Sequence, residues 1–460
     1  TSDLQGSFSL RFSKDSSGRT PGKIDLWQLG AGFGGHFYYT HTRHPSLRAS
    51  MRTVGTWRWK VRRDGWARVM VHLPDHGAHT RRAEYVVDLG NGTRRRVVGQ
   101  RVLANRWVSL GVFRFSGVPS VSLASETSDG DGDPTRKTAE ILNEDIAWDA
   151  AAIQPLPRKP SEIVVSLGDS FSSGEGASAA GGVDYYRDSD NNGDNASLQN
   201  ACHRSRYSWS RRARIPGQER SIGYLHDHWS SAVEHVALAC SGATAEHIIS
   251  SDPYANGELP RTGFGLRSAS RFGELPQLDR GFVDSNTTMV TVSIGGNDSG
   301  FIPVFMSCVS PTPCAPTDPN ADPTRAKIVG PVRSSLMTVL SEIRRKAPHA
   351  RIFLMGYPHL VEGDGKTPMC LPFVYNTEAA YMNKMTDLLA RTEEEVVDEF
   401  NRQRGRRVAF YVDPRPDFEG HEACTGTPYI RGYELEKTPG ENPSNDPLSG
   451  GRPASQQTLH

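Results

Sequence analysis

The stretch EIVVSLGDSFSSGEG, Glu162 to Gly176, sets the fold of the larger part of the chain. Residues 163–167 form a continuous apolar run that ends at a glycine, which is typical of a strand buried on both faces. Asp169 and Ser170 follow at the kind of strand end where open α/β sheets build their sites. Asp and Ser are also frequent in tight turns, where they bond to the local backbone. The stretch alone leaves both interpretations open.

Alternating strands and helices continue from this stretch toward the C-terminus. Apolar residues at helical spacing between the later strands predict two amphipathic helices, around 332–343 and 382–400. Such alternation predicts an α/β fold with a parallel sheet that helices cover on both faces. The predicted strands are 163–167, 233–239, 289–294, 352–356 and 408–412.

A different pattern precedes Glu162. Short segments rich in aromatic or β-branched residues follow one another, and Asn91-Gly92 between two of them is a strong hairpin motif. This pattern predicts an antiparallel β-sandwich in residues 1–153, a stiff proline-rich linker in 154–160 that joins neither core, and the α/β domain in 161–460. The segments are HFYYTHT, GTWRWKVRR, WARVMVHL, AEYVVDL, RRRVVGQR, WVSLGVFRF and SVSLAS.

Length and composition agree with two globular domains. The chain has 460 residues, 36% of them hydrophobic, and a formal net charge of +1, which indicates no general affinity for nucleic acid or anionic membranes. No apolar stretch is long enough to span a bilayer. The chain starts at Thr1, so either an export signal has been removed or the sequence is excised from a longer one. Six of the eight tryptophans lie before residue 150, where we expect core positions more than sugar-stacking ones.

The six cysteines predict disulfides. They form no CxxC pair and show no zinc-finger spacing with histidines, so a structural zinc site is not expected. An even number scattered through loops favours an oxidising, extracellular compartment. Cys308 and Cys314 would close a short loop, and the other four would form two long-range bridges: Cys202, Cys240, Cys370 and Cys424.

Two further glycine-flanked polar loops follow predicted strands. The sequence SIGGNDSGF puts Asn297 and Asp298 after one strand, and ALACSGATAEHI puts Gly242 after another. Three such loops at one edge of a sheet are harder to interpret as plain turns. Together, LGDSFSSGEG and IGGND resemble the SGNH (GDSL) hydrolase family over residues 161–460, with Ser170, Gly242 and Asn297 as three of its four named residues.

This resemblance implies a three-layer α/β/α domain that cleaves carboxylic esters without a cofactor. Ser170 would be the nucleophile, and its N–H, the Gly242 N–H and the Asn297 side chain would bind the oxyanion. The chemistry agrees, because fixed donors aimed at the developing negative charge typically contribute a rate factor of ~10² to 10³ each. An Asp at position 297 would instead repel the charge.

The fourth residue is a histidine that accepts the serine proton. In the family it lies in a late segment after the last strand, which points to His460, with His421 supporting the loop near Cys424; His421 as the base is the alternative. The chain ends at His460, where the family pattern continues, which favours a truncated or trimmed C-terminus. Gln457 stands where the family has an Asp, so we expect a main-chain oxygen to orient the base.

Two finer resemblances add detail. The segments around the cysteines resemble the actinobacterial secreted lipase and esterase branch, which implies bridges Cys202–Cys240, Cys308–Cys314 and Cys370–Cys424. The YVVDLGNGTRRRVVGQR, RWVSLGVFRF and EDIAWDAAAI segments resemble the golvesin C-terminal-like domain, which implies a jelly-roll-like accessory module preceding the hydrolase.

Substrate and metal binding are less determined by the sequence. The acidic runs from Asp188 and Asp129 are similar in composition to calcium loops but are more often solvated, so no metal is expected in catalysis. The substrate is expected to be an acyl ester of a lipid or small alcohol. A polysaccharide O-acetyl ester is the alternative, and a catalytically silent binding protein is the third hypothesis.

Overall fold

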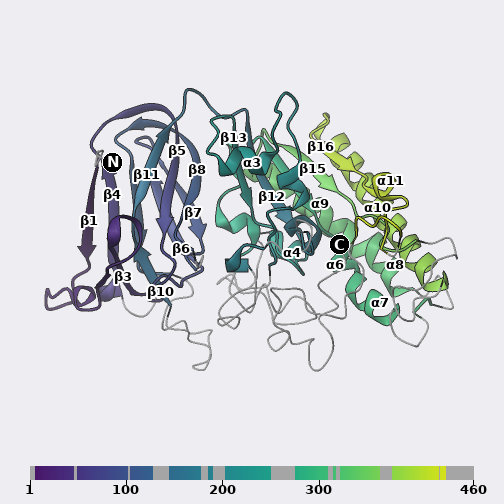
Figure 1. Ribbon diagram of the computed structural model, residues 1–460, viewed down its shortest axis with the longest axis horizontal. Coiled ribbons are helices and arrows are strands. Elements are labelled where there is room, and N and C mark those ends of the chain that lie inside the picture. Colours follow the sequence, from purple (N-terminus) through teal and green to yellow (C-terminus); the bar gives the residue numbers. More distant parts are fainter. Residues whose placement is uncertain are drawn as a thin grey trace.

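The computed structural model describes residues 6–45, 49–101, 104–127, 144–177, 185–189, 202–249, 275–308, 314–316, 322–362, 376–423 and 425–430. Two bodies lie side by side (Figure 1), with the antiparallel strands of the first next to the mixed helices and strands of the second. No helix within the described ranges is both long and apolar enough to cross a bilayer.

The N-terminal body is an antiparallel β-sandwich, as predicted. A five-stranded sheet in the order β1-β4-β9-β6-β7 faces two three-stranded sheets, β10-β3-β2 and β11-β5-β8. The expected Asn91-Gly92 turn joins β6 to β7, with the Leu89 N–H donating to Gly92 O at 2.9 Å. The strands are β1 (Gly6–Phe12), β2 (Trp27–Leu29), β3 (Phe37–His41), β4 (Thr53–Trp59), β5 (Arg63–Leu73), β6 (Ala83–Asp88), β7 (Thr93–Val98), β8 (Arg106–Gly117), β9 (Ser120–Ala124), β10 (Asp145–Trp148) and β11 (Ala151–Pro155).

The connection between the domains differs from the predicted linker. Strand β11 runs through Gln154 and Pro155, which pair with β5. Leu156 is buried in a cluster with Val112 and Ile163. The segment therefore joins the packed interior, where removing the apolar Leu156 side chain from water is favourable.

The second body contains the predicted parallel sheet. Its strand order is β13-β12-β14-β15-β16, so the chain moves from β12 to one side and then crosses back to the other. The strand order reverses direction at β12. Open α/β sheets bind ligands in the crevice outside the carboxyl ends of the strands at such a reversal. The strands are β12 (Glu162–Gly168), β13 (Val233–Ala237), β14 (Met289–Ser293), β15 (Arg351–Met355) and β16 (Ala409–Val412).

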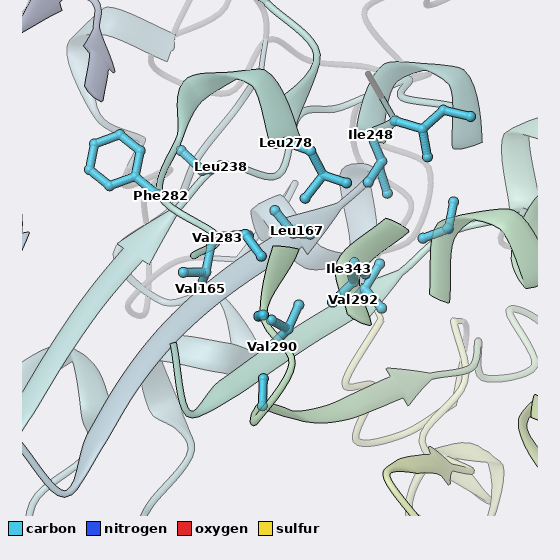
Figure 2. Packing of buried hydrophobic residues seen from close by; sticks show 14 of the residues in the cluster. Val165, Leu167, Leu238, Ile248, Leu278, Phe282, Val283, Val290, Val292 and Ile343 are labelled. Carbon is cyan, nitrogen blue, oxygen red and sulfur yellow. The ribbon is translucent and has the colours of Figure 1, made fainter. Parts of the chain in front are cut away.

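Helices pack on the sheet according to the alternation of its side chains. Val164 lies in a cluster with Ile215 and Ile222, next to α3, whereas Val165 and Leu167 belong to the cluster that contains Ile343 of α9 (Figure 2). The predicted helical repeats correspond to α9 and α10. The helices are α1 (Ser170–Ser173), α2 (Trp209–Arg212), α3 (Ile222–Asp227), α4 (Ala245–Ile248), α6 (Gly296–Ser299), α7 (Phe301–Cys308), α8 (Pro323–Lys327), α9 (Arg333–Lys346), α10 (Asn376–Arg404) and α11 (Arg415–Phe418).

Short helices of other types complete the described secondary structure. The segment η8 (Ile328–Val332) is a π-helix that precedes α9. The remaining ones are the 3₁₀ helices η1 (Pro21–Lys23), η2 (Phe33–Gly35), η3 (Ala49–Met51), η5 (Arg187–Ser189) and η7 (Gln277–Arg280).

A buried ion pair joins the two domains. Arg68 of β5 donates from Nε to Glu234 of β13 at 2.6 Å, and both side chains are at most 1% exposed. Arg68 also donates to the carbonyl oxygens of Ser230 and Val233 at 2.8 and 2.9 Å, and to Gln154 Oε1 at 2.6 Å. Saturating a buried guanidinium with acceptors in this way offsets the cost of taking it out of water.

A second arginine reinforces the same interface. Arg96 of β7 donates to Asp284 at 2.5 Å and to the carbonyl oxygens of Gly281 and Leu110. Asn286 donates to Val112 O at 3.2 Å from the hydrolase side. The docking therefore depends on specific polar contacts as well as on the shared apolar core.

We predict that Arg68→Met destabilises the protein by about 3–5 kcal/mol, because Glu234 is left buried without its partner. The double variant Arg68→Met/Glu234→Met is expected to recover most of this loss, since it removes both charges. Denaturant unfolding in a double-mutant cycle measures the coupling. The exposed pair Arg62 and Asp64 is the matched control, and changing it should leave the unfolding midpoint unchanged. Additive effects of the two single changes would contradict this account.

Candidate active site

Strand β12 delivers Ser170 to the carboxyl edge of the sheet. Gly168 ends the strand with φ at +127°, and a Cβ there would lie 2.3 Å from Ser293 O. Asp169 then caps helix α1, its carboxylate accepting from the Phe171 N–H at 3.0 Å. Ser170 is the first residue of α1 and is partly exposed. Asp169 thus shapes the turn that presents the Ser170 hydroxyl.

The loop after β14 carries Asn297 on helix α6. Gly295 has φ at +120°, which lets the chain turn sharply from the strand into the helix. The Asp169 N–H donates to Ser293 O at 3.0 Å, so this loop begins directly beside the Ser170 turn. Asn297 is partly exposed at the same strand edge.

The loop after β13 carries Gly242. Its φ of +76° favours glycine, and the absence of a side chain leaves its N–H open to approach. Two bonds attach this segment to its surroundings: the Cys240 N–H donates to Gly168 O at 3.0 Å, and the Ser241 N–H donates to Cys202 O at 3.1 Å. A disulfide between Cys202 and Cys240 adds a covalent link.

Direct hydrogen bonds connect the Asn297 and Gly242 loops. Asn297 Nδ2 donates to Ala243 O at 2.9 Å. The Asp298 carboxylate accepts from the Ala245 N–H at 3.1 and 3.2 Å. One N–H of the Asn297 amide is therefore used for positioning, which leaves the other for a ligand. The structure brings together the three loops that the sequence singled out.

A second layer of side chains supports these loops. The Tyr357 hydroxyl donates to Asp169 at 2.5 Å and accepts from the Gly296 N–H at 3.2 Å, so it connects the Ser170 turn with the Asn297 loop. Gln277 accepts from the Gly168 N–H at 2.8 Å and donates to its carbonyl at 2.7 Å. Sequence reasoning missed both residues; the GYP segment after β15 was the available indication for Tyr357.

Burial raises the pKa of the carboxyl groups in and behind these loops. It raises the pKa of Asp169 to about 7, against the opposing effect of the Tyr357 and Phe171 hydrogen bonds, and raises the pKa of Asp298 to about 6. Glu393 of α10 lies behind them, and burial raises its pKa well above the usual range. Neither Glu393 oxygen has a hydrogen-bond partner among the described residues, so the protonated form is favoured there.

The structure describes one of the two histidines that are candidates for the general base. His460 lies outside the described residues. His421 is described: its Nδ1 donates to Thr427 O at 2.6 Å, and its ring stacks on Tyr429 with centroids 3.8 Å apart. A carbonyl oxygen thus orients this ring and places the lone pair on Nε2. Within the described ranges, no hydrogen bond joins Ser170 Oγ to a histidine.

The remaining predictions concern cysteines and metals. The structure contains the Cys202–Cys240 and Cys308–Cys314 disulfides, two of the three pairings that the resemblance implies. Cys370, Cys424 and the Asp129 run lie outside the described residues. Asp188 is described and pairs with Arg106 at 3.3 Å, and the described part of the chain contains no cluster of metal-ligating side chains.

Comparisons with known proteins agree with this geometry. A model described as Golvesin C-terminal domain matches residues 23–131, and one described as GDSL-like Lipase/Acylhydrolase matches residues 164–436. Lipase 1 of Streptomyces coelicolor is 30% identical over 212 residues, which span 45% of this chain and 74% of that protein. A lipase of Streptomyces rimosus is 28% identical over 233 residues, 50% of this chain and 81% of that protein.

A crystal structure of an extracellular lipase from Streptomyces rimosus is 23% identical, with a TM-score of 0.39, and covers 60% of this chain and 89% of that one. The hydrolase family model, by contrast, spans more than half of the 460 residues and includes all three loops of the site. The chain therefore belongs to the GDSL-like lipase/acylhydrolase family and is a carboxylic ester hydrolase.

Proposed function

We propose that this protein is an extracellular serine esterase in which Ser170 is the nucleophile and His460 the general base. The N–H groups of Ser170 and Gly242 and the Asn297 amide form the oxyanion hole. The observation that carries the proposal is the 2.9 Å bond from Asn297 Nδ2 to Ala243 O. It holds a neutral donor in a fixed orientation beside Gly242, as stabilisation of a developing oxyanion requires.

The reaction proceeds by double displacement. Ser170 Oγ attacks the ester carbonyl carbon while the histidine takes its proton, and the carbonyl electron pair moves to the oxygen held by the three donors. The tetrahedral intermediate collapses, and the leaving alcohol receives the proton from the histidine. Water then attacks the acyl-enzyme with the same proton transfers and releases the carboxylic acid. No cofactor takes part.

His421 is retained as the alternative base. Its Nδ1 already donates to a carbonyl oxygen, which is how a base without an acidic partner would be oriented. His460 is favoured by its late place in the sequence. Separate substitutions of the two histidines distinguish these assignments.

The preferred substrates are acyl esters of lipids or small alcohols, in keeping with the lipases of the two Streptomyces relatives. One observation supports a polysaccharide O-acetyl ester instead. Trp27 on the β10-β3-β2 sheet is 41% exposed and stacks on Tyr39 with centroids 5.8 Å apart, and such exposed aromatic surface suits contact with a sugar ring. The two disulfides support an oxidising, extracellular location.

We predict that Ser170→Ala lowers kcat on p-nitrophenyl esters by roughly 10⁴-fold or more, because no other group replaces the nucleophile. His460→Ala is expected to cause a comparable loss, whereas His421→Ala retains activity. Asn297→Ala should reduce kcat by roughly 10² to 10³-fold. The exposed Ser334 of α9 supplies the control Ser334→Ala.

An ester series from acetate to palmitate measures these effects and the chain-length preference together. A preference restricted to acetate would favour the deacetylase, and activity on long chains would favour the lipase. If His421→Ala abolishes activity and His460→Ala does not, the base is His421. A wild-type protein inactive on every ester would overturn the enzyme assignment and favour a binding protein.

We predict that Tyr357→Phe lowers kcat by about tenfold with little change in KM, because the Asp169 carboxylate and the Gly296 N–H lose the hydroxyl that joins them. The Tyr357 hydrogen bond favours ionised Asp169, so its loss raises the Asp169 pKa above its value of about 7. Ionised Asp169 accepts the Phe171 N–H bond that shapes the Ser170 turn, so the acid limb of the kcat profile should move to higher pH. Tyr224→Phe, at an exposed tyrosine, is the control; superimposable pH profiles for wild type and Tyr357→Phe would refute the positioning role.

A further inference from the structure

A cavity of about 330 Å³ lies between the two domains. Strands β7 and β8 of the sandwich line one side, and β13 with the Tyr186 and Asp227 segments lines the other. Its volume is within the range of small-molecule sites. As far as the structure describes its walls, they do not include the three loops of the candidate active site.

The lining carries a strong excess of positive charge. Two aspartates of the lining oppose the arginines: Asp188 lies 3.3 Å from Arg106, and Asp227 lies 2.6 Å from Arg211. Behind the lining, the buried Glu144 lies 3.5 Å from Arg81. His226 and His235 also line the cavity, and burial lowers the pKa of both, so they are neutral. The arginines are Arg81, Arg101, Arg106, Arg204, Arg211 and Arg280.

Three guanidinium groups gather around one aromatic ring at the cavity wall. Arg106, Arg206 and Arg211 lie 5.5, 5.4 and 5.7 Å from the centre of the Tyr186 ring. The ring attracts each cation, but like charges at this spacing repel one another. An anion bound among these guanidinium groups would offset their mutual repulsion.

Two arginines of the lining have side-chain donors without an acceptor in the part of the chain that the structure describes. Arg101 is 9% exposed, and the Nε atoms of Arg101 and Arg106 are buried with no hydrogen-bond partner among the described residues. A buried donor without an acceptor is costly. Guanidinium forks match carboxylate and phosphate oxygens in geometry as well as charge.

We propose that this cavity binds a small organic oxyanion, a carboxylate or a phosphate, whose charged group contacts Arg101 and Arg106. Trp107, Trp229 and Phe282 supply apolar walls for the body of the ligand. The site bridges the domains, because Arg101 and Arg106 belong to the sandwich while Tyr186 and Arg211 belong to the hydrolase. It is independent of the ester chemistry at Ser170.

The test is calorimetric titration of the full chain with inorganic phosphate and with D-glucuronate at matched ionic strength. D-glucose is the neutral control, since it has a similar ring and no charge. Binding of either anion but not of glucose is expected, and the anion that binds identifies the ligand as a phosphate or a carboxylate. Arg101→Gln and Arg106→Gln should weaken binding by about tenfold or more.

Arg95→Gln on β7 is the matched control, because Arg95 is exposed and lies outside the lining. It should bind the anion as the wild type does. Thermal unfolding without ligand verifies that each variant is folded; if Arg101→Gln does not fold, Arg106→Gln carries the test, since its side chain is one-third exposed. Absence of anion binding in the wild type, or equal binding by Arg106→Gln, would overturn the proposal.

Discussion

The candidate site depends on the backbone at Gly168. This residue has a positive φ and no space for a Cβ beside Ser293. Its carbonyl oxygen accepts from both Gln277 and Cys240, and its N–H donates to Gln277. One residue thus fixes the Ser170 turn, the Gly242 segment and the end of β14 relative to one another. A side chain at this position would displace all three together.

The supporting layer explains how these loops stay in place without much regular structure of their own. Helices α1, α4 and α6 have only four residues each, too few for their internal hydrogen bonds to hold them. Tyr357 and Asp298 instead connect one loop to the next. The preorganisation that ester hydrolysis requires therefore comes from side chains outside the reacting set.

Much of this architecture could be predicted from the sequence. Strand β12 was found because its apolar run ends at Gly168, and α9 and α10 because their apolar residues recur at helical spacing. The three loops were found because polar residues follow strands that end at the same edge. Strand β1 was also absent from the predicted segments, and strand β2 was missed because it is three residues long and largely exposed.

Other features could not be predicted because they depend on contacts distant in sequence. Arg68 and Glu234 are 166 residues apart, and each alone resembles an ordinary surface charge. Tyr357 is 188 residues from Asp169, and only the folded sheet brings them together. The buried position of Leu156 depends on docking of the second domain, which the local composition of the connection does not reveal.

Strand β13 lies at the edge of the parallel sheet, and it is this edge that the sandwich covers. An uncovered edge strand presents backbone groups that can pair with another chain. Without the sandwich, Glu234 of β13 would lose Arg68, the cation that neutralises it. The C-terminal end of β13 leads to the Gly242 loop. A hydrolase domain cut at the connection would therefore expose an unpaired edge strand that leads directly into the candidate site.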